Sequence, residues 1–291
     1  MSAAPAGRTG PTPGEWLFVT LGVVAFGPAL LELASVWRAT DYLSHGFMVP
    51  VVAGFLAVGR RGAWQQLAPQ RDLKGLALVA LALAIATLGL LADVPSWVGL
   101  AVVGAAVGVV WTLRGRAGVR VMAFPLAFLV FMVPPPVSWI GPLILRLQLW
   151  VSVAAVEILR VAGFAILRDG NVLVLPSGGS LFVDEACSGI TSVVTLVPLG
   201  VLLAWTTERT PGRRAVLLAC ILPAAMFGNL VRVTATVWIA SMHGVEVATS
   251  GLLHEWSGIF TYVLACALLL GVSMLQGRLL GKPPEARGAA A

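Results

Sequence analysis

The sequence predicts an all-α polytopic membrane protein with about eight transmembrane helices, an interfacial or re-entrant helix and a short β-hairpin. Three observations support this fold class. Of the 291 residues, 58% are hydrophobic and 11% are charged, whereas a soluble domain carries about 25% charged residues. The mean hydropathy is +0.93. Many apolar runs approach the ~20 residues that a helix needs to cross ~30 Å of hydrocarbon.

The apolar runs define the expected spans and the domain boundaries. Residues 1–14 are polar and rich in Pro and Gly, and we expect a disordered cytoplasmic tail there, with no removable signal peptide. Residues 15–277 form one transmembrane domain, and residues 278–291 form a second cytoplasmic tail. The predicted spans are 16–36, 45–59, 75–92, 97–113, 120–134, 188–206, 214–240 and 256–276.

A segment of a different kind lies between the fifth and sixth spans. The sequence "PPPVSWIGP" (134–142) ends a helix, because proline removes a donor and clashes with the preceding turn. The apolar segment 143–167 then carries Arg146, Glu157 and Arg160 roughly on one helical face. This pattern favours a helix that lies in the interface or dips into it.

The next segment, "NVLVLPSGGSLFVDEA" (171–186), predicts a short β-hairpin. Apolar residues alternate around Pro-Ser-Gly-Gly, which is typical of two strands joined by a turn. The edges of a hairpin cannot lie exposed in lipid, so we expect it at the membrane surface or against the protein.

The basic residues orient the bundle. If the amino terminus is cytoplasmic and 143–167 does not cross, fourteen Lys or Arg residues fall inside and four fall outside, with Arg232 within a span. This bias follows the positive-inside rule and places both termini in the cytoplasm. These basic residues lie in short loops between apolar runs, as membrane topology requires. We therefore expect the protein to interact with the lipid bilayer and not with nucleic acid.

Cys187 differs from the other two cysteines. Cys220 and Cys266 lie within apolar runs, where a thiol is a small hydrophobe. Cys187 stands in "VDEACSGITS" (183–192), after Asp184 and Glu185, at the predicted outer end of the sixth span. Three cysteines provide no disulfide framework, so Cys187 is expected to be a free thiol.

Two further residues are expected at the same depth as Cys187. Arg232 lies ~17 residues into the seventh span, or ~25 Å along a ~30 Å core, which is just below the outer surface. His254 begins the eighth span from that side. A thiol needs a base to become a strong nucleophile, and arginine offers a fork of donors for an oxyanion. The three types together predict an acyl-transfer site.

Structural interpretations of these residues remain open at this point. Cys187 is also compatible with simple packing, and Arg232 with a pair to Glu185 or with the outer head groups. A charge within a span costs on the order of 2.5–3.5 kcal/mol, however, and such charges are usually functional. His45 and His243 also fall on the outer side and compete with His254 for the role of base.

Supporting residues are expected around these three. They are Glu185, Ser188, Asn229 and His45. Glu185 has three open roles: orienting a base, pairing with Arg232, or capping the sixth helix. We expect neither a metal nor a cofactor, because no Cys, His and carboxylate cluster has ligand spacing and no phosphate-binding glycine loop occurs.

Three motifs in this chain resemble the core of the exosortases, which are bacterial multi-pass enzymes of the exosortase/archaeosortase family. They are "EACSGI" (185–190), "NLVR" (229–232) and "HEWSG" (254–258). The segment "SHGFMVP" (44–50) resembles the family's amino-terminal motif, and the similarity covers roughly residues 40–275.

The resemblance implies roles and partners. Cys187 would be the nucleophile, with Arg232 and His254 as its partners. The substrates would be exported proteins that end in a Pro-Glu-Pro motif, a membrane helix and a basic tail. The reaction would be a protease or transpeptidase reaction through a thioester, with an unknown acceptor nucleophile and a link to exopolysaccharide or biofilm export. The site would face the periplasm from the bacterial cytoplasmic membrane.

Two functions of other classes also fit a polytopic bundle. One is a noncatalytic transporter or channel component for polysaccharide or a lipid carrier, in which Arg232 would bind an anion. No inverted repeat or paired broken span supports that function in the sequence. The other is a noncatalytic scaffold, which leaves the combination of Cys187, Arg232 and His254 unexplained.

Overall fold

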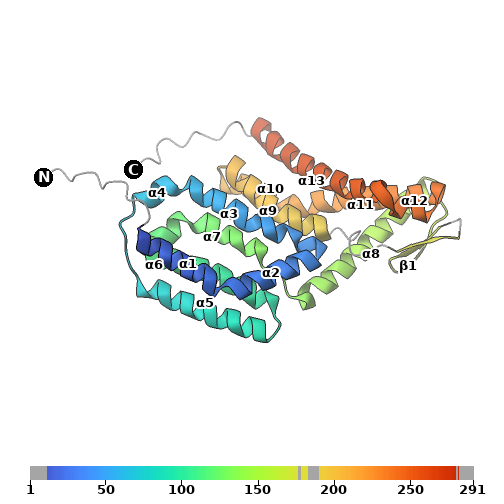
Figure 1. Cartoon of the computed structure of the whole chain (residues 1–291). Helices are drawn as coiled ribbons and strands as arrows, with labels where there is room; N and C mark the ends of the chain where they lie inside the picture. The colour runs from blue at the N-terminus through green and yellow to red at the C-terminus, as the bar shows by residue number, and fades with distance from the viewer. Residues whose placement is uncertain (1–11, 176–177, 183–189, 280, 282–291) are drawn as a thin grey trace. The chain divides into compact units, whose positions relative to one another are not determined.

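The structure is a computed structural model that describes residues 12–175, 178–182, 190–279 and 281; the side chains of 137 and 251–255 are outside this description. The chain divides into two compact units, Met1–Val137 and Ser138–Ala291. Helices dominate the described part of both units (Figure 1). The predicted fold class, a helical membrane protein with a small β element, is confirmed.

The described elements of the first unit are all helices, joined by short non-helical segments. Its elements are α1 (Pro13–Ala25), α2 (Gly27–Ala39), the 3-10 helix η1 (Asp41–Phe47), α3 (Met48–Gly59), α4 (Arg61–Gln65), α5 (Leu73–Leu91), α6 (Pro95–Val121), α7 (Ala123–Phe128) and the 3-10 helix η2 (Leu129–Met132).

The first predicted span is a bent pair of helices. Helix α1 and helix α2 meet at an angle of 55°. Pro28 occupies the first turn of α2, where it cannot donate a hydrogen bond back to α1. Thr12 and Glu15 form a capping box that starts α1.

Helices α5 and α6 form a closely packed pair. A β-carbon at Gly108 would lie 2.9 Å from the carbonyl oxygen of Gly75, so the two backbones approach where neither helix has a side chain. Small residues allow this approach between membrane helices. Helix α6 continues beyond its predicted end at residue 113, but with non-helical backbone at Arg114 and Gly115.

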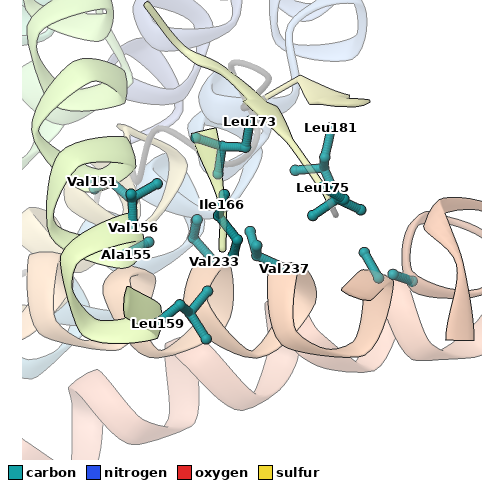
Figure 2. Packing of buried hydrophobic residues seen from close by; sticks show 12 residues of the cluster. Val151, Ala155, Val156, Leu159, Ile166, Leu173, Leu175, Leu181, Val233 and Val237 are labelled. Carbon is teal, nitrogen blue, oxygen red and sulfur yellow. The ribbon is translucent and has the colours of Figure 1, made fainter. Parts of the chain in front are cut away.

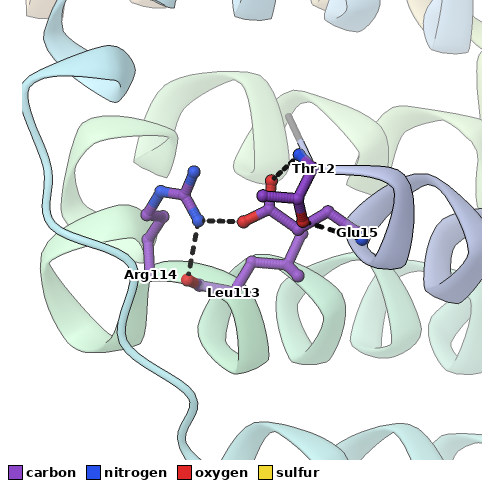
Figure 3. A network of polar contacts seen from close by, with 4 residues as sticks. All are labelled: Thr12, Glu15, Leu113 and Arg114. Carbon is purple, nitrogen blue, oxygen red and sulfur yellow. Dashed lines mark hydrogen bonds and ion pairs between the residues drawn. The ribbon is translucent and has the colours of Figure 1, made fainter. Parts of the chain in front are cut away.

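A polar network surrounds this break in α6 (Figure 3). The Arg114 guanidinium is 2% exposed and donates to a carboxylate oxygen of Glu15. The same nitrogen donates to the carbonyl of Leu113 at 3.0 Å, and the guanidinium lies 5.1 Å from the centre of the Trp64 ring. Arg114 is one of the fourteen basic residues that the sequence assigns to the cytoplasmic side. The structure buries it as a link between the start of α1 and the break within α6.

The helices that can cross a membrane differ from the predicted ones in the region between the fourth and the sixth predicted span. By length and composition, the described residues contain seven helices that can cross a membrane, or eight if α1 and α2 form one span. The expected fifth span, 120–134, is a shorter apolar helix, Ala123–Met132, because the chain becomes extended at Val133 before three prolines. Ser138–Val161 is instead long and apolar enough to cross. The interfacial placement of that segment therefore stays a prediction.

The second unit combines helices with a small sheet. Its described elements are α8 (Val137–Val161), β1 (Leu167–Asp169), β2 (Val172–Val174), β3 (Ser180–Phe182), α9 (Ile190–Thr207), α10 (Pro211–Ala219), α11 (Ile221–His243), α12 (Val245–Thr249) and α13 (Gly251–Leu279).

The predicted hairpin is present as part of a three-stranded antiparallel sheet, in the order β1-β2-β3. Strands β2 and β3 pair with Leu173 opposite Leu181. The additional strand β1 joins β2 through a tight turn in which Gly170 has φ +61°. Only glycine adopts this backbone conformation readily, so its position explains the turn.

The sheet packs against α8 and α11 through one buried cluster (Figure 2). Leu173 and Leu181 point from the sheet toward Val233 and Val237 of α11. The cluster consists of Val151, Ala155, Val156, Leu159, Ile166, Leu173, Leu175, Leu181, Val233, Val237, Ala240 and Ala248. A second cluster joins α9, α10, α11 and α13. Helix α11 is therefore held by packing against both clusters.

Candidate functional site

The segment that carries the predicted nucleophile lies outside the described residues. Cys187, Glu185 and Ser188 fall in 183–189, between the end of β3 at Phe182 and the start of α9 at Ile190. Their roles therefore stay predictions. The described elements that flank them are the sheet and α9, both of which belong to the second unit.

Helices α11 and α13 approach closely at Gly228. A β-carbon at Gly228 would lie 2.9 Å from the carbonyl oxygen of Thr261, closer than real β-carbons come to such atoms. Gly228 is buried, and Thr261 is 1% exposed. The absence of a side chain at 228 thus brings the two backbones together.

One helical turn away, Arg232 contacts Ser257. The Nε–H of Arg232 donates to the Ser257 hydroxyl oxygen at a distance of 3.1 Å. Arg232 lies four residues after Gly228, and Ser257 lies four residues before Thr261, so the two contacts are successive steps along antiparallel helices. The Arg232 side chain is half-buried at this contact.

The amide of Asn229 is fully enclosed on α11. Its exposed fraction is 0%, and it stands three residues before Arg232. Side chains three residues apart are neighbours on a helix surface. A buried amide and a half-buried guanidinium therefore form a polar region in a helix that is otherwise mostly apolar. The supporting role of Asn229 stays a prediction.

Position 254 lies in the first turn of α13, three residues before Ser257. The side chain of His254 lies outside the described residues, so only its backbone position enters the description of the site. The backbone position alone places it one helical turn from the Arg232–Ser257 contact. His254 therefore stays a predicted base.

His45 belongs to the first unit and contacts two backbone carbonyls. Its Nδ1 lies 3.1 Å from the Tyr42 carbonyl oxygen, and its Nε2 lies 3.1 Å from that of Phe131. A carbonyl only accepts hydrogen bonds and a neutral imidazole has a single N–H, so the ring donates to one of these two carbonyls while its other nitrogen faces the second. A general base needs a ring nitrogen with a lone pair directed at the proton. The geometry of His45 therefore suits a structural link between η1 and η2.

The residues around His45 reinforce this interpretation. The Trp37 indole N–H donates to the carbonyl of Met132 at 3.0 Å. A β-carbon at Gly46 would lie 2.5 Å from Trp37 Nε1, so only glycine allows the tryptophan to occupy this position. Phe47 packs edge-on against the same ring, with the ring centres 5.1 Å apart. His243, the third histidine, is exposed at the end of α11.

Ser257 is the residue whose role the sequence analysis did not identify. The sequence shows it only as part of a polar stripe with Thr261. Its contact with Arg232 depends on how α11 and α13 are paired, which no local pattern reveals. The i, i+4 spacing of Gly228 with Arg232 and of Ser257 with Thr261 places each pair on one helical face, but it does not show that the two faces meet.

The chemistry of the described site is that of an oriented cation. The hydrogen bond at Nε fixes the plane of the guanidinium. A planar fork of N–H donors suits an oxyanion or a peptide carbonyl. Among the described residues, no group of three or more His, Cys, Asp or Glu has the arrangement of a metal site.

Comparison with known proteins gives one match. The family of transmembrane exosortases matches residues 37–271 of the chain. No curated protein and no solved structure gave a significant match. The matched range includes Arg232 and Ser257 as well as positions 187 and 254.

Proposed function

Because the chain belongs to the transmembrane exosortase family, we propose that it is a membrane-embedded cysteine protease or transpeptidase. Its substrates are exported proteins that carry a carboxy-terminal sorting signal with a Pro-Glu-Pro motif, a membrane helix and a basic tail. Such a reaction fits a role in exopolysaccharide or biofilm export. The observation that carries this proposal is the family match, which spans Cys187, Arg232 and His254.

The reaction begins with the thiol of Cys187. His254 accepts the thiol proton, and the thiolate sulfur attacks the carbonyl carbon of the scissile peptide bond. The carbonyl π electrons move to the oxygen, and the Arg232 guanidinium stabilises this oxyanion or holds the substrate. The C–N bond then breaks, the protonated His254 returns its proton to the departing amine, and a thioester remains on Cys187. Water or an acceptor amine displaces the thiolate and releases the product.

The chain length makes contact between Cys187 and Arg232 feasible. Leu181 lies in the buried cluster that also contains Val233, the neighbour of Arg232. Cys187 is the sixth residue after Leu181, and an extended chain of six residues reaches about 20 Å at most. Cys187 is therefore tethered within reach of the helix that carries Arg232.

The side of the membrane depends on how many segments cross before residue 183. With a cytoplasmic amino terminus and α1–α2 as one span, four candidate spans precede residue 122. If one of the segments Ala123–Met132 and Ser138–Val161 crosses, positions 183–189 face the periplasm, as the sequence predicts. If both cross, these positions face the cytoplasm. We propose the first arrangement, in the bacterial cytoplasmic membrane.

The experiment that tests the function replaces the predicted nucleophile. Cys187→Ala, produced as the full-length protein together with a tagged substrate, is expected to insert normally and to leave the substrate uncut. Cys266→Ala is the matched control, because Cys266 lies within α13, beside the buried Ala265 and three residues before the buried Leu269. Normal processing of the substrate by Cys187→Ala would reject the enzyme proposal. It would favour the noncatalytic transporter, because transport should not depend on the Cys187 thiol.

A further inference from the structure

We infer that Ser257 is a positioning residue: through its hydroxyl it fixes the orientation of the Arg232 guanidinium toward the reacting carbonyl. The observation is the hydrogen bond from Arg232 Nε to Ser257 Oγ, at 3.1 Å. This inference rests on the proposed function, because it assigns Ser257 a part in the same reaction.

The position of this hydrogen bond on the guanidinium is informative. Nε joins the flexible stem of arginine to its planar group, so an acceptor at Nε restricts rotation of the whole plane. The two terminal nitrogens are then held in one direction by the rigid geometry of the fork. Preorganised donors stabilise an oxyanion better than donors that must reorient during the reaction.

The acceptor itself is held by the helix packing. Gly228 and the Thr261 carbonyl bring the backbones of α11 and α13 together one turn away from Ser257. The Thr261 hydroxyl donates to the Ser257 carbonyl at 2.8 Å, within the same turn. Thr236, one turn further along α11, donates to the carbonyl of Arg232 at 3.0 Å. The donor and the acceptor of the Arg232–Ser257 bond thus both stand on closely packed helices.

The chemical type of the acceptor also matters. A serine hydroxyl is neutral, so it orients the guanidinium without adding a negative charge beside it. An aspartate at 257 would accept a stronger hydrogen bond but would offset the positive charge that the oxyanion requires. A purely structural contact would tolerate that exchange, whereas a positioning role would not.

The test uses the full-length protein in lipid nanodiscs with six variants. They are Ser257→Ala, Ser257→Thr, Ser257→Asp, Arg232→Lys, the double variant Ser257→Ala/Arg232→Lys and the control Ser273→Ala. Ser273 is a matched control because it is a serine of the same helix whose hydroxyl donates to Glu208, in a different part of α13. The first readout is the solvent exchange rate of the Arg232 Nε proton by ¹⁵N NMR, assigned by its absence in Arg232→Lys. The second is the rate of substrate cleavage.

Exchange of the Nε proton should become faster in Ser257→Ala, and remain slow in Ser257→Thr and Ser273→Ala. In Ser257→Ala, kcat should fall by about ten- to a hundredfold, the usual effect of losing a hydrogen bond to a charged group, with little change in KM. Ser257→Thr should stay within about threefold of the wild type. Ser257→Asp should lose activity although it keeps an acceptor. In the Arg232→Lys background, Ser257→Ala should have no further effect, because the two residues act as one unit.

Three results would overturn the inference. They are an unchanged exchange rate in Ser257→Ala, an equal loss of activity in Ser273→Ala, and independent effects of the changes at 257 and 232. A wild-type protein without cleavage activity would instead contradict the proposed function. Faster exchange in Ser257→Ala alone would, in that case, still support the orientation of Arg232 by Ser257.

Discussion

Gly228 of α11 lies against the carbonyl oxygen of Thr261 of α13, so closely that a β-carbon at 228 would be 2.9 Å from that oxygen. The obstacle is backbone, which cannot rotate away as a side chain can. This contact sets the separation of the two helices that carry Arg232 and Ser257.

The first prediction follows from this contact. Gly228→Ala should lower the free energy of unfolding by about 1–3 kcal/mol, the usual cost of overpacking, although alanine is the better helix former. Cleavage should fall at least tenfold because the helices separate at Arg232. Thermal unfolding in detergent and a cleavage assay measure the two effects. Gly271→Ala in α13 is the control: nothing lies within 4 Å of its β-carbon, and it should be neutral or stabilising.

The second prediction concerns His45. Its ring lies between the carbonyls of Tyr42 in η1 and Phe131 in η2 and donates its one N–H to one of them. Such a hydrogen bond contributes about 0.5–1.5 kcal/mol. His45→Ala should therefore lower the unfolding temperature, while the molecules that remain folded retain cleavage. The exposed His243 should tolerate alanine without either effect. A His45→Ala protein of normal stability and no activity would identify His45 as the base instead.

The third prediction concerns the buried ion pair of Glu15 and Arg114. Glu15→Gln removes the counter-charge of a guanidinium that is 2% exposed, and breaking such a pair costs about 3–5 kcal/mol. The control is Glu157→Gln, which breaks the exposed pair with Arg160 and should cost less than about 1 kcal/mol. Equal effects of the two changes, measured by thermal unfolding, would contradict the burial of Arg114.

The fourth prediction is a dependence of stability on acid pH at Asp72, which caps α5. The backbone N–H of Lys74 and the indole N–H of Trp111 lower the pKa of Asp72. The carboxylate therefore stabilises the fold above its unfolded pKa of about 3.9, and this stabilisation is lost as the pH falls through the lower folded pKa.

Asp72→Asn tests this dependence, because asparagine also caps a helix but does not titrate. Its unfolding temperature should fall less steeply than that of the wild type below about pH 4. Parallel curves for the two proteins across the acid range would show that Asp72 does not contribute.

The apolar runs predicted most of the described helices, because the bilayer fixes both their length and their composition. The errors lie where tertiary contacts or proline decide the outcome. Helix Ala123–Met132 is shorter than expected because three prolines follow it. Strand β1 was not foreseen, since Leu167–Asp169 becomes a strand only by pairing with β2. Arg114 is buried through a partner, Glu15, that is 99 residues away.

The candidate site was predictable only in its residue types. Arg232 stood out as a charge within an apolar run, and it is half-buried on α11 in the structure. Its bond to Ser257, 25 residues further along the chain, was not predictable, because the hydrophobic pattern gives the face of each helix but not which helices pair. The family resemblance seen in the motifs is confirmed by the match over residues 37–271.

The side of the membrane can be measured through the thiols. A thiol-reactive reagent that does not cross membranes, applied to intact spheroplasts, should label Cys187 but neither Cys220 nor Cys266. Labelling of Cys187 only after the membrane is opened would mean that Ala123–Met132 and Ser138–Val161 either both cross or both fail to cross, and would contradict the proposed side.

The central claim is that the substrate becomes covalently attached to the sulfur of Cys187. Mass spectrometry of the acid-quenched protein after mixing with substrate tests this claim most directly. The account predicts a substrate fragment joined to Cys187 by a bond that hydroxylamine cleaves, and no such adduct in Cys187→Ala. Cleaved substrate without any adduct, or an adduct that persists in Cys187→Ala, would contradict it.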